Sequence, residues 1–480
     1  MKKAARYLML TFCMMLIFVQ SVFAGEKDYV KFFLPEKDGV NQPFVGDTMP
    51  YYEDGVYYIY YLKEGGDSYR HSIYLTTTTD FLTYEDVQEP ILVSSSEGAQ
   101  DAWIGTGSVV KVEDTYYLFY TGHADNSEHE FNETVMLAKG SDLRTFEKVA
   151  DWEMIPDESL GQKRDFRDPQ AYYDEEKQQL VFTITAAQEG VARILKYTVS
   201  KDLSEITYDG IIFTDPIGKV YNLECSDTFK IGDTYYLTYS AQDDTLWYAA
   251  STEPYGPYSD PVRMDGPLFY AAKHVEDGEH AYMVGWGRRS KNEANTTSVD
   301  EWAGNLVAQE IHQKEDGSLV LAPVAALEAL YQNEQPLTID TAEALLEAGE
   351  DRVYADFCNA EDSFMLKGNF TFEGTGKFGL AFTYKDGDEN DKLITVSPRF
   401  GTLTLNFKAG KRRVAELDGL TLNSGETYSF TYIQENSLGV FYIDDVAAFT
   451  VRLYKVNGKP IRLFAEDMKV QFSDLKLFTE

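Results

Sequence analysis

Three acidic residues at corresponding places in repeated segments are the side chains best suited to chemistry. Asp47 lies in Gly46-Asp47-Thr48-Met49-Pro50, Asp168 in Arg167-Asp168-Pro169, and Glu224 in Glu224-Cys225-Ser226. Each is followed a few residues later by a strand-like aromatic segment. Carboxylates that several repeats direct at one centre suit glycosidic bond cleavage, in which one acid attacks or activates and another protonates the leaving oxygen.

The repeat that carries these acids predicts the fold. An acidic or glycine-containing turn followed by an aromatic and aliphatic strand recurs about every 45 to 63 residues, at 54–61, 113–120, 176–183, 232–239 and 277–284. This spacing accommodates one four-stranded blade per copy. Further strands are expected at 72–77, 134–138 and 194–199. Five copies predict a five-bladed β-propeller.

The pattern of residues changes near Pro323, which indicates a domain boundary. Residues 324–330 and 341–346 resemble short helical connectors, and alternating strand-like runs resume at 370–372, 378–382, 402–407 and 439–443. Turn residues separate these runs, which favours a β-sandwich. We therefore predict an all-β protein with a signal peptide at 1–24, a propeller at 25–323, a linker at 324–345 and a C-terminal sandwich at 346–480.

The N-terminus and the composition restrict the location and the partners. A basic start, an apolar stretch from Leu8 to Val19 and a small residue at Ala24 predict a cleaved signal peptide, export to the extracellular space, and no membrane span afterwards. The formal net charge is −36, which disfavours nucleic acid and anionic lipid and leaves a neutral carbohydrate as the expected partner.

The cysteine and histidine content predicts neither a disulfide framework nor a cofactor. Cys225 and Cys358 remain after cleavage and fall in different predicted domains, and Cys225 is expected to be a small buried residue. The six histidines show no spacing typical of a zinc site. No metal or other cofactor is expected.

The innermost strand of each blade lines a propeller's channel, so the segments just before the aromatic strands are expected to meet there. Arg167 should keep the adjacent Asp168 ionised and suited to hydrogen-bond sugar hydroxyls. Glu224 has Leu223 and Cys225 as less polar neighbours that could raise its pKa, which makes it the candidate acid/base. Asp47 is the candidate nucleophile.

Several motifs resemble those of glycoside hydrolase family 32, the β-fructosidases that include invertases, inulinases and levanases. Arg167-Asp168-Pro169 resembles the family's RDP motif, Glu224-Cys225 its EC motif, and Phe269-Tyr270-Ala271 its FYA segment, in the family's order. The resemblance implies that Asp47 is the nucleophile, Asp168 the transition-state stabiliser and Glu224 the acid/base. It implies retaining hydrolysis of β-fructofuranosidic bonds in sucrose or fructans.

The resemblance also suggests residues that contact the substrate, and it has departures. Thr106 and Ser108 fall where the family has the serines of an SGS-type segment, and with Arg167 and Tyr270 they are predicted to bind substrate. Gly46–Pro50 replaces the usual NDPNG stretch. Gly105 replaces a common aromatic residue, for which Trp103 is the candidate substitute.

Two other readings stay open. An inverting five-bladed arabinanase or xylosidase would also present three acids, with a wider gap between carboxylates than a retaining enzyme has. A secreted propeller that binds carbohydrate without catalysis would share the fold but show no turnover. The sequence does not choose between sucrose, inulin and levan.

Overall fold

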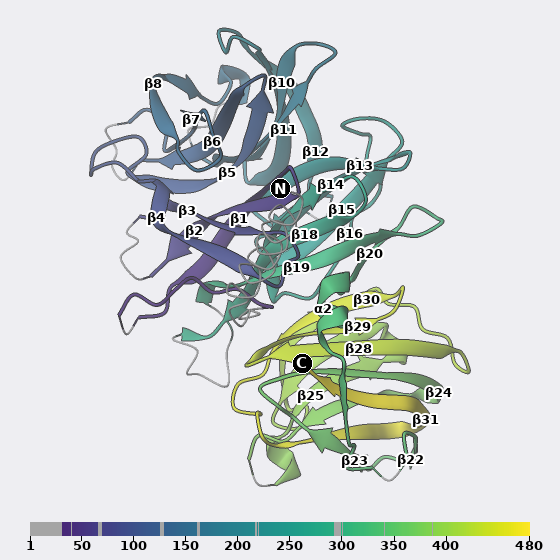
Figure 1. Cartoon of the computed structure of the whole chain (residues 1–480). Helices are drawn as coiled ribbons and strands as arrows, with labels where there is room; N and C mark the ends of the chain where they lie inside the picture. Colours follow the sequence, from purple (N-terminus) through teal and green to yellow (C-terminus); the bar gives the residue numbers. More distant parts are fainter. Residues whose placement is uncertain are drawn as a thin grey trace, which may run out of the picture.

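The computed structural model describes residues 31–480, apart from 40, 66–69, 125–128, 161–163, 217, 219, 292–298, 300, 340 and 386. The predicted signal peptide therefore lies outside the described residues. Nearly all of the regular structure consists of strands, arranged as a propeller followed by a sandwich (Figure 1). No helix in the described ranges is both long and apolar enough to cross a membrane.

Five blades of four antiparallel strands form the propeller. In chain order they are β1 (Phe44–Glu53), β2 (Val56–Glu64), β3 (Ile73–Thr78) and β4 (Tyr84–Leu92); β5 (Trp103–Val112), β6 (Thr115–His123), β7 (Glu133–Gly140) and β8 (Glu147–Met154); β9 (Phe166–Asp174), β10 (Gln179–Gln188), β11 (Val191–Ser200) and β12 (Ile206–Thr214); β13 (Leu223–Ile231), β14 (Thr234–Ala241), β15 (Thr245–Ser251) and β16 (Val262–Arg263); and β17 (Phe269–Glu276), β18 (Ala281–Arg289), β19 (Glu301–Gln313) and β20 (Leu319–Ala322). A short 3₁₀ turn, η1 (Glu158–Leu160), precedes β9.

The predicted repeat is confirmed. Each aromatic run is the second strand of a blade, and the segment before it is the first strand, as expected for a β-meander. The aromatic side chains pack into clusters between neighbouring blades, such as the one that joins Phe119 to Phe182 with ring centroids 4.7 Å apart. Aromatic residues suit this architecture because a large flat side chain fills the gap between two twisted sheets.

The propeller closes between its last and first blades. Val45 of β1 lies opposite Gly304 of β19, so the fifth and first blades form one continuous sheet. The segment before β1 reinforces this contact, because the amide of Leu306 donates to the carbonyl of Phe33 at 2.9 Å. Closure holds the inner strands of all five blades around one axis, which fixes the relative positions of the residues at their start.

A short helix, α2 (Ala325–Leu330), follows the propeller, as predicted for 324–330. The second predicted helical connector, 341–346, is wrong: strand β22 (Ala344–Ala348) lies there and pairs with the last strand of the chain. Its Ala, Leu and Glu residues favour a helix. Pairing with a neighbouring strand overrides that preference and buries Ala344 and Leu346 in the sandwich core.

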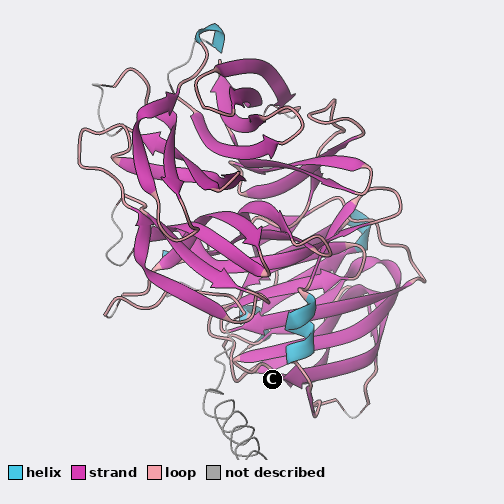
Figure 2. Ribbon diagram, turned by 45° about the horizontal axis from the view of Figure 1, so that its top comes forward, coloured by secondary structure: helices cyan, strands magenta, loops and turns pink. Residues whose placement is uncertain are grey.

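The C-terminal domain is a β-sandwich, visible below the propeller in Figure 1. Its other strands are β21 (Asn333–Gln335), β23 (Val353–Asn359), β24 (Ser363–Phe382), β25 (Lys392–Ser397), β26 (Thr402–Phe407), β27 (Arg412–Leu417), β28 (Thr427–Glu435), β29 (Leu438–Ile443), β30 (Ala447–Arg452) and β31 (Pro460–Thr479), with the 3₁₀ turns η3 (Asp388–Asn390) and η4 (Pro398–Phe400). Figure 2 shows how strands dominate both domains.

Two predicted strands of the sandwich are one strand in the structure. The runs at 370–372 and 378–382 both belong to the 20-residue β24. The first half of β24 pairs with β28 and its second half with β25, and its register with β31 shifts between Gly374 and Lys377. A single long strand therefore pairs with β28 along its first half and with β25 along its second half, and with β31 along most of its length.

Buried polar groups join the two domains behind the fifth blade. Arg452 of β30 is 1% exposed and donates to the carbonyls of Arg288 and Gly287 at 3.0 and 2.9 Å. Asp265 accepts hydrogen bonds from Thr450 and Gln309. Because β18 and β19 take part in this interface, the sandwich supports the blade that closes the propeller.

Candidate active site

A β-bulge occurs at the start of each inner strand and brings the candidate residues together. In β1, β9, β13 and β17, two residues on the inner strand face one residue on the second strand: 46–47, 168–169, 225–226 and 271–272. In β5 the extra residue is Thr106. Bulges bend a strand and redirect its side chains, and they are common beside active sites.

The register refines the predicted equivalence of the three acids. Val45, Arg167 and Glu224 are the last paired residues before the bulge in their blades. Glu224 is therefore in the paired position, Asp168 is one residue further along, and Asp47 is two residues further along. The three carboxylates come from successive positions of the same bulge and not from one repeated position.

The bulges require an unusual backbone that neighbouring blades stabilise. Asp168, Cys225 and Ala271 have φ between 50° and 56°, which costs free energy for residues other than glycine. Their amides are all satisfied by side chains. The amide of Asp168 donates to the hydroxyl of Thr121, that of Cys225 to the carboxylate of Asp168, and that of Ala271 to the hydroxyl of Ser240, all within 2.8–2.9 Å.

Residues that bind the neighbouring blade recur at one register position of the second strand. Thr121, Thr185, Ser240 and Trp286 each lie opposite the residue that precedes the bulge in their own blade, and each contacts the start of the inner strand in the next blade. In three blades this residue carries a hydroxyl group. In the fifth it is Trp286, whose indole N–H donates to Oδ1 of Asp47 at 3.0 Å.

The surroundings of Asp47 disfavour its charged form. Burial, followed by the charges of Asp168 and Glu224, raises the pKa of Asp47 to about 7, although the indole of Trp286 favours its ionised form. Contacts between blades also connect the three acids: Trp286, which binds Asp47, lies 5.5 Å from the ring of Tyr270, whose hydroxyl donates to Glu224, and Asp168 binds the amide that follows Glu224 in the chain. The predicted convergence of the acids is therefore present in the structure.

Asp168 is 4% exposed, and the charge of Arg167 acts on its pKa in the predicted direction, toward the ionised form. Burial raises the pKa of Asp168, and the charge of Arg167 offsets this only in part. The carboxylate of Asp168 accepts the amide of Cys225 at 2.8 Å, which links the third blade to the fourth. Cys225 is a buried free thiol, and burial raises its pKa. Both features agree with the prediction that Cys225 is a small buried residue and not a nucleophile.

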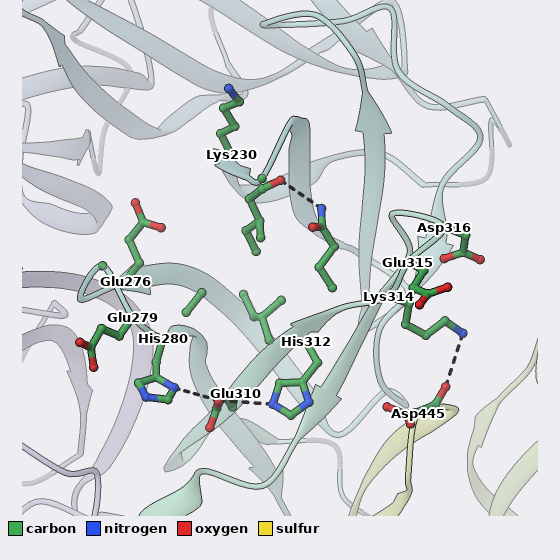
Figure 3. A pocket seen from close by; sticks show the side chains of 16 residues that line it. Lys230, Glu276, Glu279, His280, Glu310, His312, Lys314, Glu315, Asp316 and Asp445 are labelled. Atoms are coloured by element: carbon green, nitrogen blue, oxygen red, sulfur yellow. Dashed lines mark hydrogen bonds and ion pairs between the residues drawn. The ribbon is translucent and has the colours of Figure 1, made fainter.

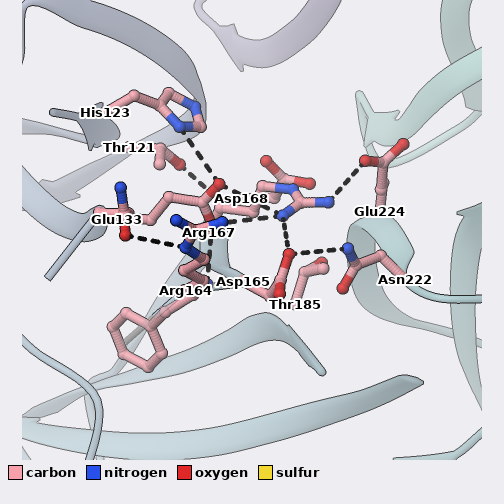
Figure 4. A network of polar contacts seen from close by, with 12 residues as sticks. Thr121, His123, Glu133, Arg164, Asp165, Arg167, Asp168, Thr185, Asn222 and Glu224 are labelled. Carbon is pink, nitrogen blue, oxygen red and sulfur yellow. Dashed lines mark hydrogen bonds and ion pairs between the residues drawn. The ribbon is translucent and has the colours of Figure 1, made fainter. Parts of the chain in front are cut away.

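Arg167 is a largely buried cation that binds Glu224 directly. One guanidinium nitrogen donates to Oε1 of Glu224 at 2.8 Å, and another contacts Glu133 at 3.2 Å and Asp165 at 3.1 Å (Figure 4). His123 lies 3.3 Å from Glu133. Although burial raises the pKa of Glu133, His123 and Arg167 lower it to about 2, so Glu133 stays ionised and holds Arg167 in place.

The surroundings of Glu224 correct the sequence-based argument for its role. Its chain neighbours Leu223 and Cys225 are buried in hydrophobic clusters, Leu223 between the third and fourth blades and Cys225 beside Tyr270 and Trp286. The carboxylate itself contacts polar groups: Arg167, the hydroxyl of Tyr270 at 2.6 Å and the amide of Gln242 at 3.1 Å. Hydrogen-bond donors therefore surround this carboxylate, where the sequence suggested apolar neighbours.

The family described as glycosyl hydrolases family 32 N-terminal domain matches residues 33–323 of the chain. This span covers the whole propeller. The chain belongs to glycosyl hydrolase family 32. The arrangement of Asp47, Asp168 and Glu224 is thus seen in a member of a family of glycoside hydrolases.

Relatives of known name match part of this family 32 chain. Sucrose-6-phosphate hydrolase of Escherichia coli is 26% identical over 285 residues, which cover 55% of this chain and 57% of the relative. Levanase of Bacillus subtilis is 27% identical over 251 residues, or 48% of this chain and 34% of the relative. The chain thus aligns with about half or less of the length of these two relatives.

Solved structures show the same fold over the whole length. Sucrose-6-phosphate hydrolase from Lactobacillus gasseri superposes with a TM-score of 0.71 at 16% identity and covers 97% of this chain and 96% of its own. A β-fructofuranosidase of Aspergillus kawachii gives 0.73 at 15% identity, with 94% and 93% covered. At these identities the likeness establishes the fold, a five-bladed propeller with a C-terminal sandwich.

The predicted substrate-binding residues of this family 32 protein occupy different places. The hydroxyl of Tyr270 binds Glu224 directly, and Arg167 does so as described above. Thr106 lies in the bulge of β5 and is 1% exposed. Ser108 faces the third blade, where its hydroxyl donates to the carbonyl of Pro169 at 3.0 Å and accepts the amide of Ala171 at 2.9 Å. The structure gives Ser108 a role in joining blades.

Trp103 belongs to an aromatic wall beside Asp47 that the sequence did not reveal. His71 stacks on Trp302 with ring centroids 4.6 Å apart and meets the edge of Trp103 at 5.5 Å. Trp302 in turn lies 6.0 Å from Trp286. Gly46 makes the close approach possible, since a Cβ there would lie 2.2 Å from the Trp302 ring. In the sequence, the only sign of this close contact is the glycine directly before Asp47.

A cavity lies at the other end of the inner strands. It has a volume of about 980 Å³ and is lined by the turns that follow β13, β17 and β19 (Figure 3). Glu310 accepts contacts there from His280 at 3.0 Å and His312 at 3.3 Å. It contains none of the three acids. In the described residues, no group of three or more His, Cys, Asp or Glu side chains is arranged to hold a metal ion.

Proposed function

We propose that this protein is a β-fructofuranosidase that hydrolyses sucrose or fructans with retention of configuration. The observation that carries the proposal is that contacts between blades link Asp47, Asp168 and Glu224, from the first, third and fourth blades, at the bulges of a family 32 chain. The names of the relatives, which include a levanase and sucrose-6-phosphate hydrolases, support a β-fructoside as substrate.

Each acid has a role that suits its surroundings. The carboxylate of Asp47 attacks the anomeric carbon as the glycosidic bond breaks, and Glu224 gives its proton to the departing oxygen. In the second step a water molecule gives a proton to Glu224 and attacks the same carbon, which releases fructose and regenerates Asp47. Asp168 accepts hydrogen bonds from fructosyl hydroxyls, and Tyr270 and Arg167 orient Glu224.

The charges of the acids support a shared proton. The pKa of Asp47, about 7, means that this carboxyl retains a proton at mildly acidic pH, and Glu224 accepts hydrogen bonds from Arg167 and Tyr270. The first step needs Asp47 ionised and Glu224 protonated. Because the carboxyls titrate as a coupled group, a proton can pass from Asp47 to Glu224 without a change in the net charge of the site. Substrate binding at Glu224 has to favour this transfer.

We also propose that the protein acts outside the cell. The basic, apolar and small-residue segments within residues 1–24 are the support for export. Extracellular action suits polymeric substrates, which do not cross membranes unaided. Mass spectrometry of the protein from culture supernatant tests this proposal: a mature N-terminus near residue 25 is expected, and a full-length chain retained in the cell pellet contradicts it.

The direct test is incubation of the purified protein with sucrose, sucrose 6-phosphate, inulin and levan, with arabinan and aryl xylosides as comparison substrates. Release of free fructose or fructo-oligosaccharides from the first group is expected, and Glu224→Gln should abolish it. Turnover of arabinan or xylosides alone would establish the inverting alternative. Binding of fructan without turnover by the unmodified protein would favour a carbohydrate-binding protein over an enzyme.

A further inference from the structure

The outer face of the sandwich strands β25, β26 and β27 forms a groove far from the acids in sequence. Ile394 and Val396 point into the core, so the alternating residues of β25 and the matching residues of β26 point outward. Those outward residues are nevertheless buried: Thr395, Thr404 and Asn406 are 4%, 5% and 9% exposed. They form the floor of a cavity of about 520 Å³.

The charged residues around this groove form ion pairs with one another or with nearby groups. Arg352 and Lys377 both contact Glu466, at 2.7 and 3.4 Å, and Arg413 pairs with Glu416. Asp418 pairs with Arg263 of the propeller at 3.0 Å. Because these four cations and three carboxylates nearly balance, the groove offers little to a strongly charged ligand, although the chain as a whole carries a net charge of −36.

An aromatic ring stands at the rim of the groove. Phe400 ends the turn η4 and is 66% exposed, which is unusual for so large an apolar side chain. The turn is well anchored: the amide of Leu420 donates to the carbonyl of Gly401 at 2.9 Å. Gly401 has φ 61°, and a Cβ there would lie 2.4 Å from the carbonyl oxygen of Leu420. The backbone therefore holds Phe400 at this rim.

We propose that this groove is a second carbohydrate-binding site, which holds a segment of a neutral oligosaccharide chain while the propeller acts on another part of it. The Nδ2 of Asn406 donates to the hydroxyls of Thr404 and Thr395 at 2.6 and 3.4 Å, which leaves its Oδ1 as an acceptor for sugar hydroxyls beside the hydroxyl groups of Thr402 and Thr404, and Phe400 offers a flat apolar surface. The volume lies in the usual range for ligand sites. That the chain is a fructan rests on the proposed function.

Binding measured apart from hydrolysis tests the groove. In the Glu224→Gln background, affinity electrophoresis and calorimetry with levan, inulin and a neutral glucan report binding without turnover. Phe400→Ala is expected to weaken binding of the recognised polymer about 3- to 10-fold. Thr402→Arg, which places a bulky charge in the groove at a half-buried position, is expected to abolish the groove's contribution.

The matched control is Leu345→Ala, which removes an exposed apolar side chain elsewhere on the sandwich and should leave binding unchanged. Equal affinity of the parent, Phe400→Ala and Thr402→Arg proteins for every polymer would overturn the proposal. Binding of the glucan alone, lost in Phe400→Ala, would keep the groove and reject fructan as its ligand.

The activity of the otherwise unmodified protein separates this proposal from the proposed function. Phe400→Ala should leave kcat/KM for sucrose unchanged and raise KM for levan or inulin by the same factor as its binding loss. Absence of turnover on every fructoside would reject the proposed function. The binding experiment would still show whether the groove binds carbohydrate. An unchanged KM for the polymer in Phe400→Ala would contradict a role of the groove in turnover.

Discussion

Replacement of Trp286 by Phe tests the electrostatic account of the nucleophile most sharply. The substitution keeps an aromatic ring beside Tyr270 and Trp302 but removes the N–H that donates to Asp47 at 3.0 Å. A hydrogen bond to a charged group contributes about 1.5–3 kcal/mol, which corresponds to roughly 1–2 pKa units. The pKa of Asp47, about 7 in the parent, should therefore rise to roughly 8–9.

The direction of the effect on activity follows from the role of Asp47. The nucleophile works only when ionised, so the acid limb of the kcat/KM profile for sucrose should move to higher pH by about 1–2 units. At pH 6 the ionised fraction falls about 10- to 100-fold, whereas the plateau above the limb changes far less. The limb reports the coupled carboxyl group as a whole.

Trp152→Phe provides the matched control. The indole of Trp152 donates to the carbonyl of Leu203 at 3.1 Å in the propeller core, away from the acids. Its loss should lower the free energy of unfolding by about 1 kcal/mol and leave the pH profile in place. An acid limb at the same pH in folded Trp286→Phe and in the parent would refute the reasoning.

Three further outcomes are expected. Glu224→Gln should lower kcat for sucrose by about 10²- to 10⁴-fold with an unchanged thermal midpoint, and near-normal turnover would remove Glu224 from its role. Asp47→Asn should be inactive, yet at pH 8 its free energy of unfolding should exceed that of the parent by up to about 4 kcal/mol. The raised folded-state pKa of Asp47 means that the parent loses stability as pH rises from about 4 to 7, so the advantage of the variant should vanish near pH 4. The same difference in urea stability between variant and parent at both pH values would contradict this effect of the Asp47 charge. Ser108→Ala should lower the free energy of unfolding by about 1–3 kcal/mol without raising KM for sucrose, since its hydroxyl binds backbone groups; a raised KM with normal stability would show that Ser108 contacts the sugar.

The fold could be predicted from the sequence because its main signal is local and repeated. An acidic turn followed by an aromatic strand occurs once per blade, and each copy forms the same strand pair. The acids could be found because they fall just before those strands. Where local preference and tertiary pairing disagree, the prediction failed: residues 341–346 favour a helix, but from Ala344 onward the chain pairs with β31 as a strand.

The finer geometry of the site could not be predicted because it depends on contacts between blades. A bulge is visible only when a strand is aligned with its partner, so the successive positions of Asp47, Asp168 and Glu224 were hidden. Arg167 precedes Asp168 in the chain, yet its guanidinium reaches Glu224 on the next blade. His71 and Trp302 carry no motif and meet only because the first and fifth blades close the propeller.

The stereochemistry of transfer to methanol tests the central claim most directly. With sucrose as donor and methanol as acceptor, a covalent intermediate on Asp47 requires two inversions, so nuclear magnetic resonance should identify the first-formed product as methyl β-fructofuranoside. Formation of the α-anomer would show a single displacement by the acceptor and contradict the assignment of Asp47 as nucleophile.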